Sequence, residues 1–235
     1  MFVQLPLKIG LRDHASFETF VTEEESAAFA LNSLQSALKK PSGNAFYLHA
    51  ESGAGKTHLL QAACRYATEK GQTSVYLPMK DDSLPLIPDV LFGLEQTPLV
   101  CLDDMDNIIG ERRWELALAN LLTKSSVQGH NVILAGEISI VDWSLVTTEL
   151  AKALINVLPI TLNVLRDKEE VIVALQRHAD CLGFELSVEV GNYLVKQFSQ
   201  DLQELLAVLK MLEQATLVEK RRLTLPFVKK VLGHY

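Results

Sequence analysis

The sequence predicts an α/β protein with a parallel β-sheet, followed by a small all-helical region. Short apolar runs alternate with helical patterns up to Leu165, which is typical of a parallel sheet covered by helices on both faces. A loop of small residues joins the first apolar run to the next helical pattern. After Leu165 the helical patterns follow one another with no strand pattern between them, so we expect a second, helical domain there.

Each expected element has a local signal. The expected strands are apolar runs at residues 45–49, 74–77, 99–102, 132–135 and 160–164. Helical patterns in the sheet region occupy residues 23–40, 57–70, 88–94, 112–123 and 148–154, the first of them between Thr22 as N-cap and Pro41 as breaker. The later helical patterns occupy residues 167–182, 189–198, 201–218 and 225–232.

The composition is that of an acidic globular protein. The 235 residues are 48% hydrophobic and 22% charged, and the formal net charge is −7. This balance argues against a general binder of nucleic acids or membrane surfaces, which needs a basic field. No apolar run approaches the roughly 20 residues that span a bilayer, and no secretion signal is recognisable. The three cysteines form no CxxC pair, so we expect a cytoplasmic protein without a zinc site.

The loop after the first predicted strand has the pattern of a phosphate-binding loop. It reads Ser52-Gly53-Ala54-Gly55-Lys56-Thr57, with His58 next. The glycines allow backbone N–H groups to turn inward around an anion, and the following helix N-terminus adds partial positive charge. Lys56 would bind nucleotide phosphates, and the Thr57 hydroxyl would ligate Mg²⁺. The strict pattern has a glycine where this chain has Ala50, and a β–α turn with an incidental lysine is the alternative.

Two carboxylates end the third predicted strand. The apolar run at residues 99–102 is followed by Asp103 and Asp104. In a phosphate-loop protein one such carboxylate holds Mg²⁺ and the other can polarise the attacking water, so we predict catalytic roles for both and a metal role for Asp103. A pair of solvated acids at a strand end is the alternative.

In combination, these motifs resemble the AAA+ ATPases and, among them, the DnaA-related proteins. The segment Ala15-Ser-Phe-Glu-Thr-Phe20-Val21 is similar to the one ahead of the first helix in the replication initiator DnaA, where a Phe-Val pair borders the adenine. The stretches at residues 59–64, 99–103, 183–186 and 223–229 also fit this family. Because the initiator's DNA-binding helices are not expected here, the chain resembles the short regulatory members.

The resemblance implies three regions: an N-terminal arm at residues 1–21, an AAA+ nucleotide-binding domain at 22–165 and a helical lid at 166–235. It implies that ADP or ATP binds with Mg²⁺ at the phosphate loop, Phe20 and Val21. It further implies docking on the DNA sliding clamp through Gln4, Leu5 and Leu7, where a self-packed terminus is the alternative. The implied function is regulation of chromosomal replication initiation by inactivating DnaA, without sequence-specific DNA binding. A homo-oligomer is possible.

The sequence departs from the family at two arginines. Ala153 stands at the position of the arginine finger, beside Lys152, and Gln203 at that of the lid arginine. A lysine does not reproduce the planar guanidinium, so we expect weak or no intrinsic ATPase activity and leave stimulation of DnaA open. The residues Ala135-Gly136-Glu137 match the family's sensor position, which follows the fourth strand, only approximately.

The alternative function is an AAA+ loader or remodeller that uses its own hydrolysis, and a DNA-structure binder is a weaker alternative. The preference between ADP and ATP is also open.

Overall fold

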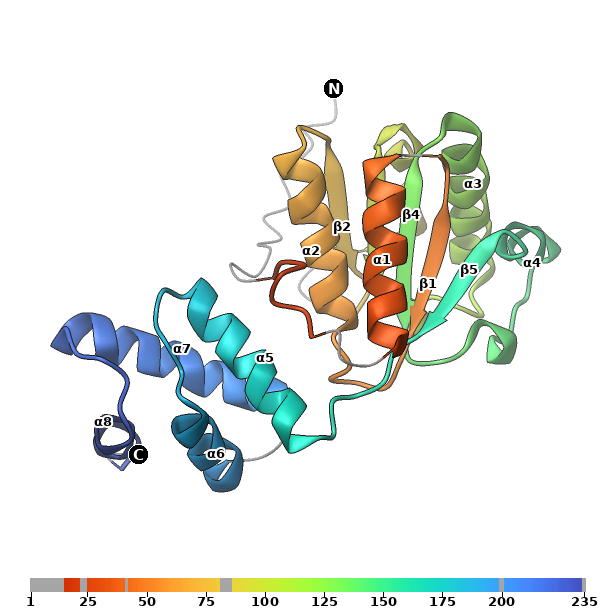
Figure 1. Ribbon diagram of the computed structural model, residues 1–235. Coiled ribbons are helices and arrows are strands. Elements are labelled where there is room, and N and C mark those ends of the chain that lie inside the picture. Colours follow the sequence, from red (N-terminus) through yellow and green to blue (C-terminus); the bar gives the residue numbers. More distant parts are fainter. Residues whose placement is uncertain (1–14, 22–24, 41, 81–85, 199–200, 234–235) are drawn as a thin grey trace.

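A computed structural model describes residues 15–21, 25–40, 42–80, 86–198 and 201–233, except for the side chain of Gln203. The predicted fold class is confirmed: a parallel sheet flanked by helices is followed by an all-helical region (Figure 1). The predicted clamp-binding residues Gln4, Leu5 and Leu7 lie outside the described residues.

The sheet in the described part of the chain contains five parallel strands in the order β2-β3-β4-β1-β5. They are β1 (Ala45–His49), β2 (Ser74–Pro78), β3 (Leu99–Asp103), β4 (Asn131–Gly136) and β5 (Val157–Thr161). Every residue of β3 and β4 is buried. Both faces of these inner strands are therefore covered, which explains why their sequences are apolar without alternation.

The last strand lies three residues earlier than predicted, at Val157–Thr161 in place of 160–164. It contains Pro159, which cannot donate a backbone hydrogen bond. Since β5 pairs only with β1 at the sheet edge among the described strands, Pro159 is tolerated there. The predicted helix at 88–94 is also wrong: two short 3₁₀ turns, Pro88–Leu91 and Leu94–Gln96, flank Gly93, whose φ of +86° interrupts any helix.

Helices cover the sheet on both faces (Figure 1). One hydrophobic core joins the sheet to α1 (Glu25–Lys39) and α2 (Lys56–Glu69). A second core, which includes Trp114 and Trp143, joins the other face to α3 (Arg112–Gln128) and α4 (Thr148–Leu154). Helix α3 runs beyond its predicted end at residue 123 and ends at Gly129, whose φ of +75° terminates the helix.

The start of α4 is held by the buried carboxylate of Glu115 on α3. Its two oxygens accept hydrogen bonds from the backbone N–H groups of Gly110, Val146 and Thr147 and from the Thr147 hydroxyl, at 2.7–3.1 Å. Burial alone would raise the pKa of Glu115, but the Thr147 hydroxyl and the backbone donors outweigh burial and lower it. Glu115 therefore fixes the loop that leads into α4.

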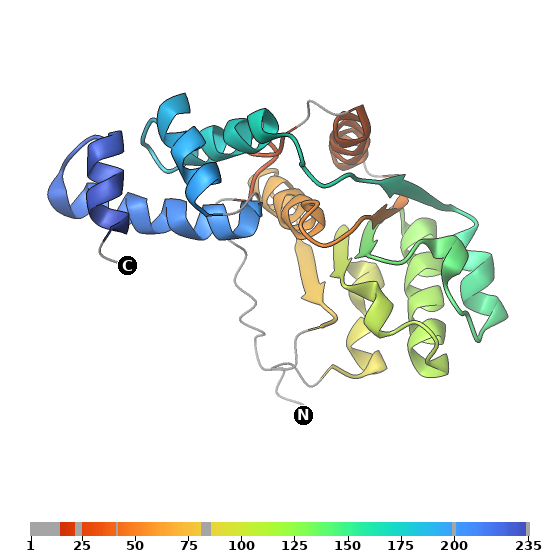
Figure 2. The same cartoon turned by 90° about the horizontal axis from the view of Figure 1, so that it is seen from below.

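The region after β5 contains, among the described residues, the helices α5 (Lys168–Cys181), α6 (Val188–Gln197), α7 (Leu202–Glu219) and α8 (Leu225–Leu232). Asp167 caps α5 by accepting from the N–H of Glu169, and Ser187 caps α6 by accepting from the N–H of Val190. These helices share a core of their own and extend away from the sheet (Figure 2). No helix in the described ranges is long and apolar enough to cross a bilayer.

Candidate functional site

The loop between β1 and α2 lies at the carboxyl ends of the strands, where ligands bind in parallel α/β sheets. Gly53 and Gly55 have φ values of +85° and +88°, which side chains other than that of glycine rarely allow. A Cβ on Gly55 would also lie 2.9 Å from the Phe20 ring, whereas a Cβ on Gly53 would meet nothing. The two glycines thus permit the turn, and Gly55 additionally permits Phe20 to approach the loop.

The ammonium group of Lys56 is turned toward this loop. Lys56 is 7% exposed, and its Nζ donates to the carbonyl oxygens of Ala50 and Glu51 at 2.7 and 3.0 Å. Its Nζ also lies 4.0 Å from Oε1 of Glu137, which follows β4. A nearly buried cation needs such partners, and oxygens of a bound anion could take their place.

Thr57 and Asp103 meet directly, although one begins α2 and the other ends β3. The Thr57 hydroxyl donates to Asp103 Oδ2 at 2.7 Å. The hydroxyl of Tyr76, on β2, donates to the same oxygen at 3.0 Å, and the N–H of Asp104 donates to Oδ1 at 3.0 Å. Burial and the charge of Asp103 raise the pKa of Tyr76 well above its usual value, so its hydroxyl keeps its proton. A hydroxyl beside a carboxylate is an oxygen pair that suits Mg²⁺.

Asp104 has a different setting. Its backbone is left-handed, with φ of +56°, and its side chain lines the cavity beside the loop. Burial, and then the charge of Asp103, raise its pKa, while Lys80 and Lys56 oppose this rise. The two predicted carboxylates are therefore in one site, with Asp103 held in hydrogen bonds and Asp104 facing the cavity.

The end of β4 supplies a third acidic residue, Glu137. Its N–H donates to Asp106 Oδ2 at 2.5 Å, and the next N–H, of Ile138, donates to Oδ1 at 3.2 Å. A Cβ on Gly136 would clash with the Tyr47 hydroxyl and with Asp106, so the tight packing at the end of β4 favours glycine there. The backbone of Glu137 is held firmly, with its carboxylate near Lys56.

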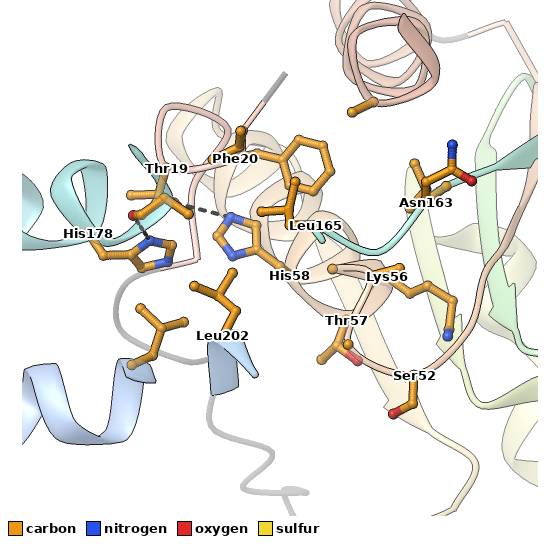
Figure 3. A pocket seen from close by; sticks show the side chains of 18 of the residues that line it. Thr19, Phe20, Ser52, Lys56, Thr57, His58, Asn163, Leu165, His178 and Leu202 are labelled. Carbon is orange, nitrogen blue, oxygen red and sulfur yellow. Dashed lines mark hydrogen bonds between the residues drawn. The ribbon is translucent and has the colours of Figure 1, made fainter. Parts of the chain in front are cut away.

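A cavity of about 140 Å³ lies between the loop and the C-terminal helices. Figure 3 shows Ser52, Lys56 and Thr57 on one side, and Thr19, His58, His178 and Leu202 on the other. The predicted nucleotide-binding residues Phe20, Val21, Ser52, Gly53, Ala54, Gly55, Lys56, Thr57 and His58 all line it. No sequence pattern predicted the part of its lining that comes from the connecting segment and the later helices: Leu162, Asn163, Leu165, Ala174, His178, Leu202 and Leu206.

His58 connects the segment before α1 to the later helices. Its Nε2 lies 2.8 Å from the Ser16 carbonyl oxygen and 3.1 Å from the Thr19 hydroxyl, and since a carbonyl only accepts, Nε2 carries the hydrogen. The His58 ring lies 5.8 Å from that of Phe20 and 5.6 Å from that of His178 on α5. Arg177, next to His178, donates to the Phe20 carbonyl oxygen at 2.6 Å. These contacts join three parts of the chain around the cavity.

The two residues that we expect at the family's arginine positions differ in setting. Ala153 is partly buried on α4, packed against the core that contains α3, while Lys152 is exposed. Gln203 lies in the first turn of α7, but its side chain is outside the described part. Ala153 is not among the described residues that line the cavity.

Two family models match separate parts of the chain. The model of the bacterial DnaA ATPase domain matches residues 11–81, and the model of the Hda lid domain matches residues 167–232. The first match covers the loop between β1 and α2, and the second covers the helices that line the other side of the cavity.

Solved structures of similar fold include three AAA+ proteins. Domain III of the Thermotoga maritima DnaA is 20% identical, with a TM-score of 0.72 over 96% of this chain and 98% of that one. AMPPCP-bound DnaA from Aquifex aeolicus is 20% identical, with a TM-score of 0.66 over 86% and 66%. The Thermotoga maritima RuvB branch migration motor is 15% identical, with a TM-score of 0.63 over 93% and 71%. At these identities the likeness shows the fold.

Proposed function

We propose that this chain, a DnaA- and Hda-related AAA+ protein, is a nucleotide-binding regulator of replication initiation that acts with the DNA sliding clamp to inactivate the initiator DnaA. The observation that carries the proposal is the composition of the cavity. One wall is the loop within the DnaA-like match, and the other comes from helices within the Hda-like match. A nucleotide in this cavity would contact both parts and couple its presence to the position of the lid.

The proposed ligand is ADP or ATP. Phe20, Val21 and Leu165 supply apolar surface for a base, while Lys56 and the N–H groups of the loop would bind the phosphates. Thr57 and Asp103 would hold Mg²⁺, which supplies positive charge to the phosphates when it is bound. Calorimetry with ADP and Mg²⁺ tests this part: we expect Lys56→Ala to weaken binding strongly, and equal affinity in the variant would exclude the phosphate-loop interpretation.

A regulator is favoured over the alternative, an AAA+ loader or remodeller driven by its own hydrolysis. A homo-oligomeric motor needs an arginine that reaches the neighbouring nucleotide, where it increases the rate by about 10³–10⁵-fold. Ala153 offers no such group, and its partly buried position on α4 directs it into the core. The exposed Lys152 is a point charge without the planar fork of arginine.

The partners are tested by size-exclusion chromatography of this chain with the clamp and the initiator, in ADP, in ATP and without nucleotide. We expect co-elution with the clamp, and recruitment of the initiator that depends on nucleotide. Binding of neither partner under any of these conditions would contradict the regulatory proposal. Steady hydrolysis by the chain alone would favour the loader or remodeller.

A further inference from the structure

The C-terminal helices share no hydrophobic core with the sheet. In the described part of the chain, the apolar side chains of α5, α6, α7 and α8 pack into a core of their own, and none of them belongs to the two cores around the sheet. Figure 2 shows these helices extending to one side of the sheet. Without a common core, the position of the helices depends on a small number of polar and ring contacts between the two regions.

Arg177 on α5 makes one of these contacts, with the segment that precedes α1. Its Nη1 donates to the carbonyl oxygen of Phe20 at 2.6 Å, although the two residues are 157 positions apart in the chain. A guanidinium is charged at any pH near neutrality, and hydrogen bonds from a charged donor are stronger than those from a neutral one. Arg177 is half-buried and is not among the described residues that line the cavity. It can therefore affect a bound nucleotide only through the groups that it holds in place.

The segment that accepts this hydrogen bond is itself fixed to α2. Within residues 15–21, the Phe17 ring is buried and lies 5.6 Å from the ring of Tyr66. The carbonyl oxygen of Ser16 lies 2.8 Å from Nε2 of His58. Both Tyr66 and His58 are on α2, so residues 15–21 are a fixed part of the sheet region. The hydrogen bond from α5 thus attaches the C-terminal helices to a firm support.

We propose that Arg177 is a positioning residue that holds α5 against residues 15–21 and so keeps the nucleotide cavity closed. The inference rests on the proposed nucleotide binding and adds the residue that joins the two walls of the cavity. Phe20 and Val21 line one wall, and His178, next to Arg177 on α5, lines the other. When the hydrogen bond to Phe20 is broken, α5 moves away together with His178. Because a nucleotide that contacts both walls binds the closed form, loss of this hydrogen bond lowers its affinity.

The test compares the full chain with three variants. Arg177→Met removes the charge and the donors but keeps an apolar stem, and Arg177→Lys restores a charged donor. Arg166→Met is the matched control, because the Arg166 guanidinium lies 3.3 Å from the Glu51 carboxylate across the same two regions, but both side chains are largely exposed. Such exposed ion pairs contribute little. The measurements are ADP affinity and release rate with Mg²⁺, the melting temperature, and hydrogen exchange of residues 15–21 without nucleotide.

We expect Arg177→Met to weaken ADP binding about tenfold, through faster release, at an unchanged melting temperature. Hydrogen exchange of residues 15–21 should become faster in this variant, because the segment loses its attachment to α5. Arg177→Lys should recover most of the affinity and of the protection from exchange. Arg166→Met should leave the affinity within about twofold of that of the unmodified chain.

Two results would overturn the positioning role. One is unchanged ADP affinity and unchanged exchange of residues 15–21 in Arg177→Met. The other is a lower melting temperature that Arg177→Lys does not restore, since this would indicate lost packing among the C-terminal helices. The exchange measurement contains no nucleotide, so it tests the contact independently of the proposed function. That function would be refuted separately, by unchanged ADP affinity in Lys56→Ala.

Discussion

Replacing Glu115 by glutamine should strongly destabilise the folded protein. The carboxylate has no exposed surface, and it accepts hydrogen bonds from three backbone N–H groups and one hydroxyl. An amide offers only one oxygen. If that oxygen occupies the Oε2 position, the donors of Val146 and Thr147 remain satisfied, but the amide NH₂ then faces the N–H of Gly110.

The magnitude follows from this geometry. The variant leaves one buried N–H unpaired and weakens the remaining hydrogen bonds, which lose their charged acceptor. A buried unpaired donor costs about 1–3 kcal/mol, and weaker bonds add to this, so we expect a loss of about 2–4 kcal/mol of unfolding free energy. For a chain of this size that loss lowers the melting temperature by about 5–15 °C.

Thermal and urea unfolding at neutral pH measure this effect. Glu111→Gln is the matched control, because Glu111 precedes the same helix, is exposed and makes no capping hydrogen bond with its side chain. The pH dependence provides a second readout. Since folding lowers the pKa of Glu115 below its ordinary value of 4.5, its stabilisation is present above that value and is lost as the pH falls through the lower folded pKa. The unfolding free energies of the unmodified protein and of Glu115→Gln should therefore become equal at acidic pH. A melting temperature of Glu115→Gln at neutral pH that equals that of Glu111→Gln would refute the reasoning.

Further predictions concern the metal, the clamp and hydrolysis. Tyr76→Phe removes the hydroxyl that donates to the Asp103 carboxylate, and it should weaken ADP binding in the presence of Mg²⁺ about tenfold while ADP binding without Mg²⁺ is unchanged. Equal losses of affinity with and without Mg²⁺ would indicate a general structural effect. Deleting residues 1–8 should leave the melting temperature unchanged and abolish clamp binding, and full binding by the truncated chain would place the contact elsewhere. Stimulation of the initiator's ATPase should be weak and should rise with Ala153→Arg but not with Lys152→Ala, as measured by phosphate release with clamp and DNA; robust stimulation by the unmodified chain would contradict the assignment of the arginine positions.

Elements with strong local signals were predicted well. The turn between β1 and α2 was recognisable because Gly53 and Gly55 adopt left-handed backbone conformations that glycine allows at little cost. The helices of the C-terminal region begin within one residue of their predicted starts, since caps and helical periodicity are both local properties. The expected position of β5 was wrong because it depends on the assembled sheet and not on a local signal. Pro159 excludes an inner strand but not an edge strand, and only the assembled sheet places β5 at the edge.

Local sequence patterns were enough to predict the fold class, the glycine-rich turn with Lys56 and Thr57, and the acidic strand end, because backbone preference and hydrophobic periodicity act over a few residues. The tertiary structure alone sets which distant groups meet. It brings the Tyr76 hydroxyl onto Asp103, closes the cavity with His178 and places Glu137 beside Lys56. These contacts depend on strand order and on the packing of helices against the sheet. No local pattern encodes such an arrangement, since the side chains that meet come from separate elements and are brought together by burial of the shared cores.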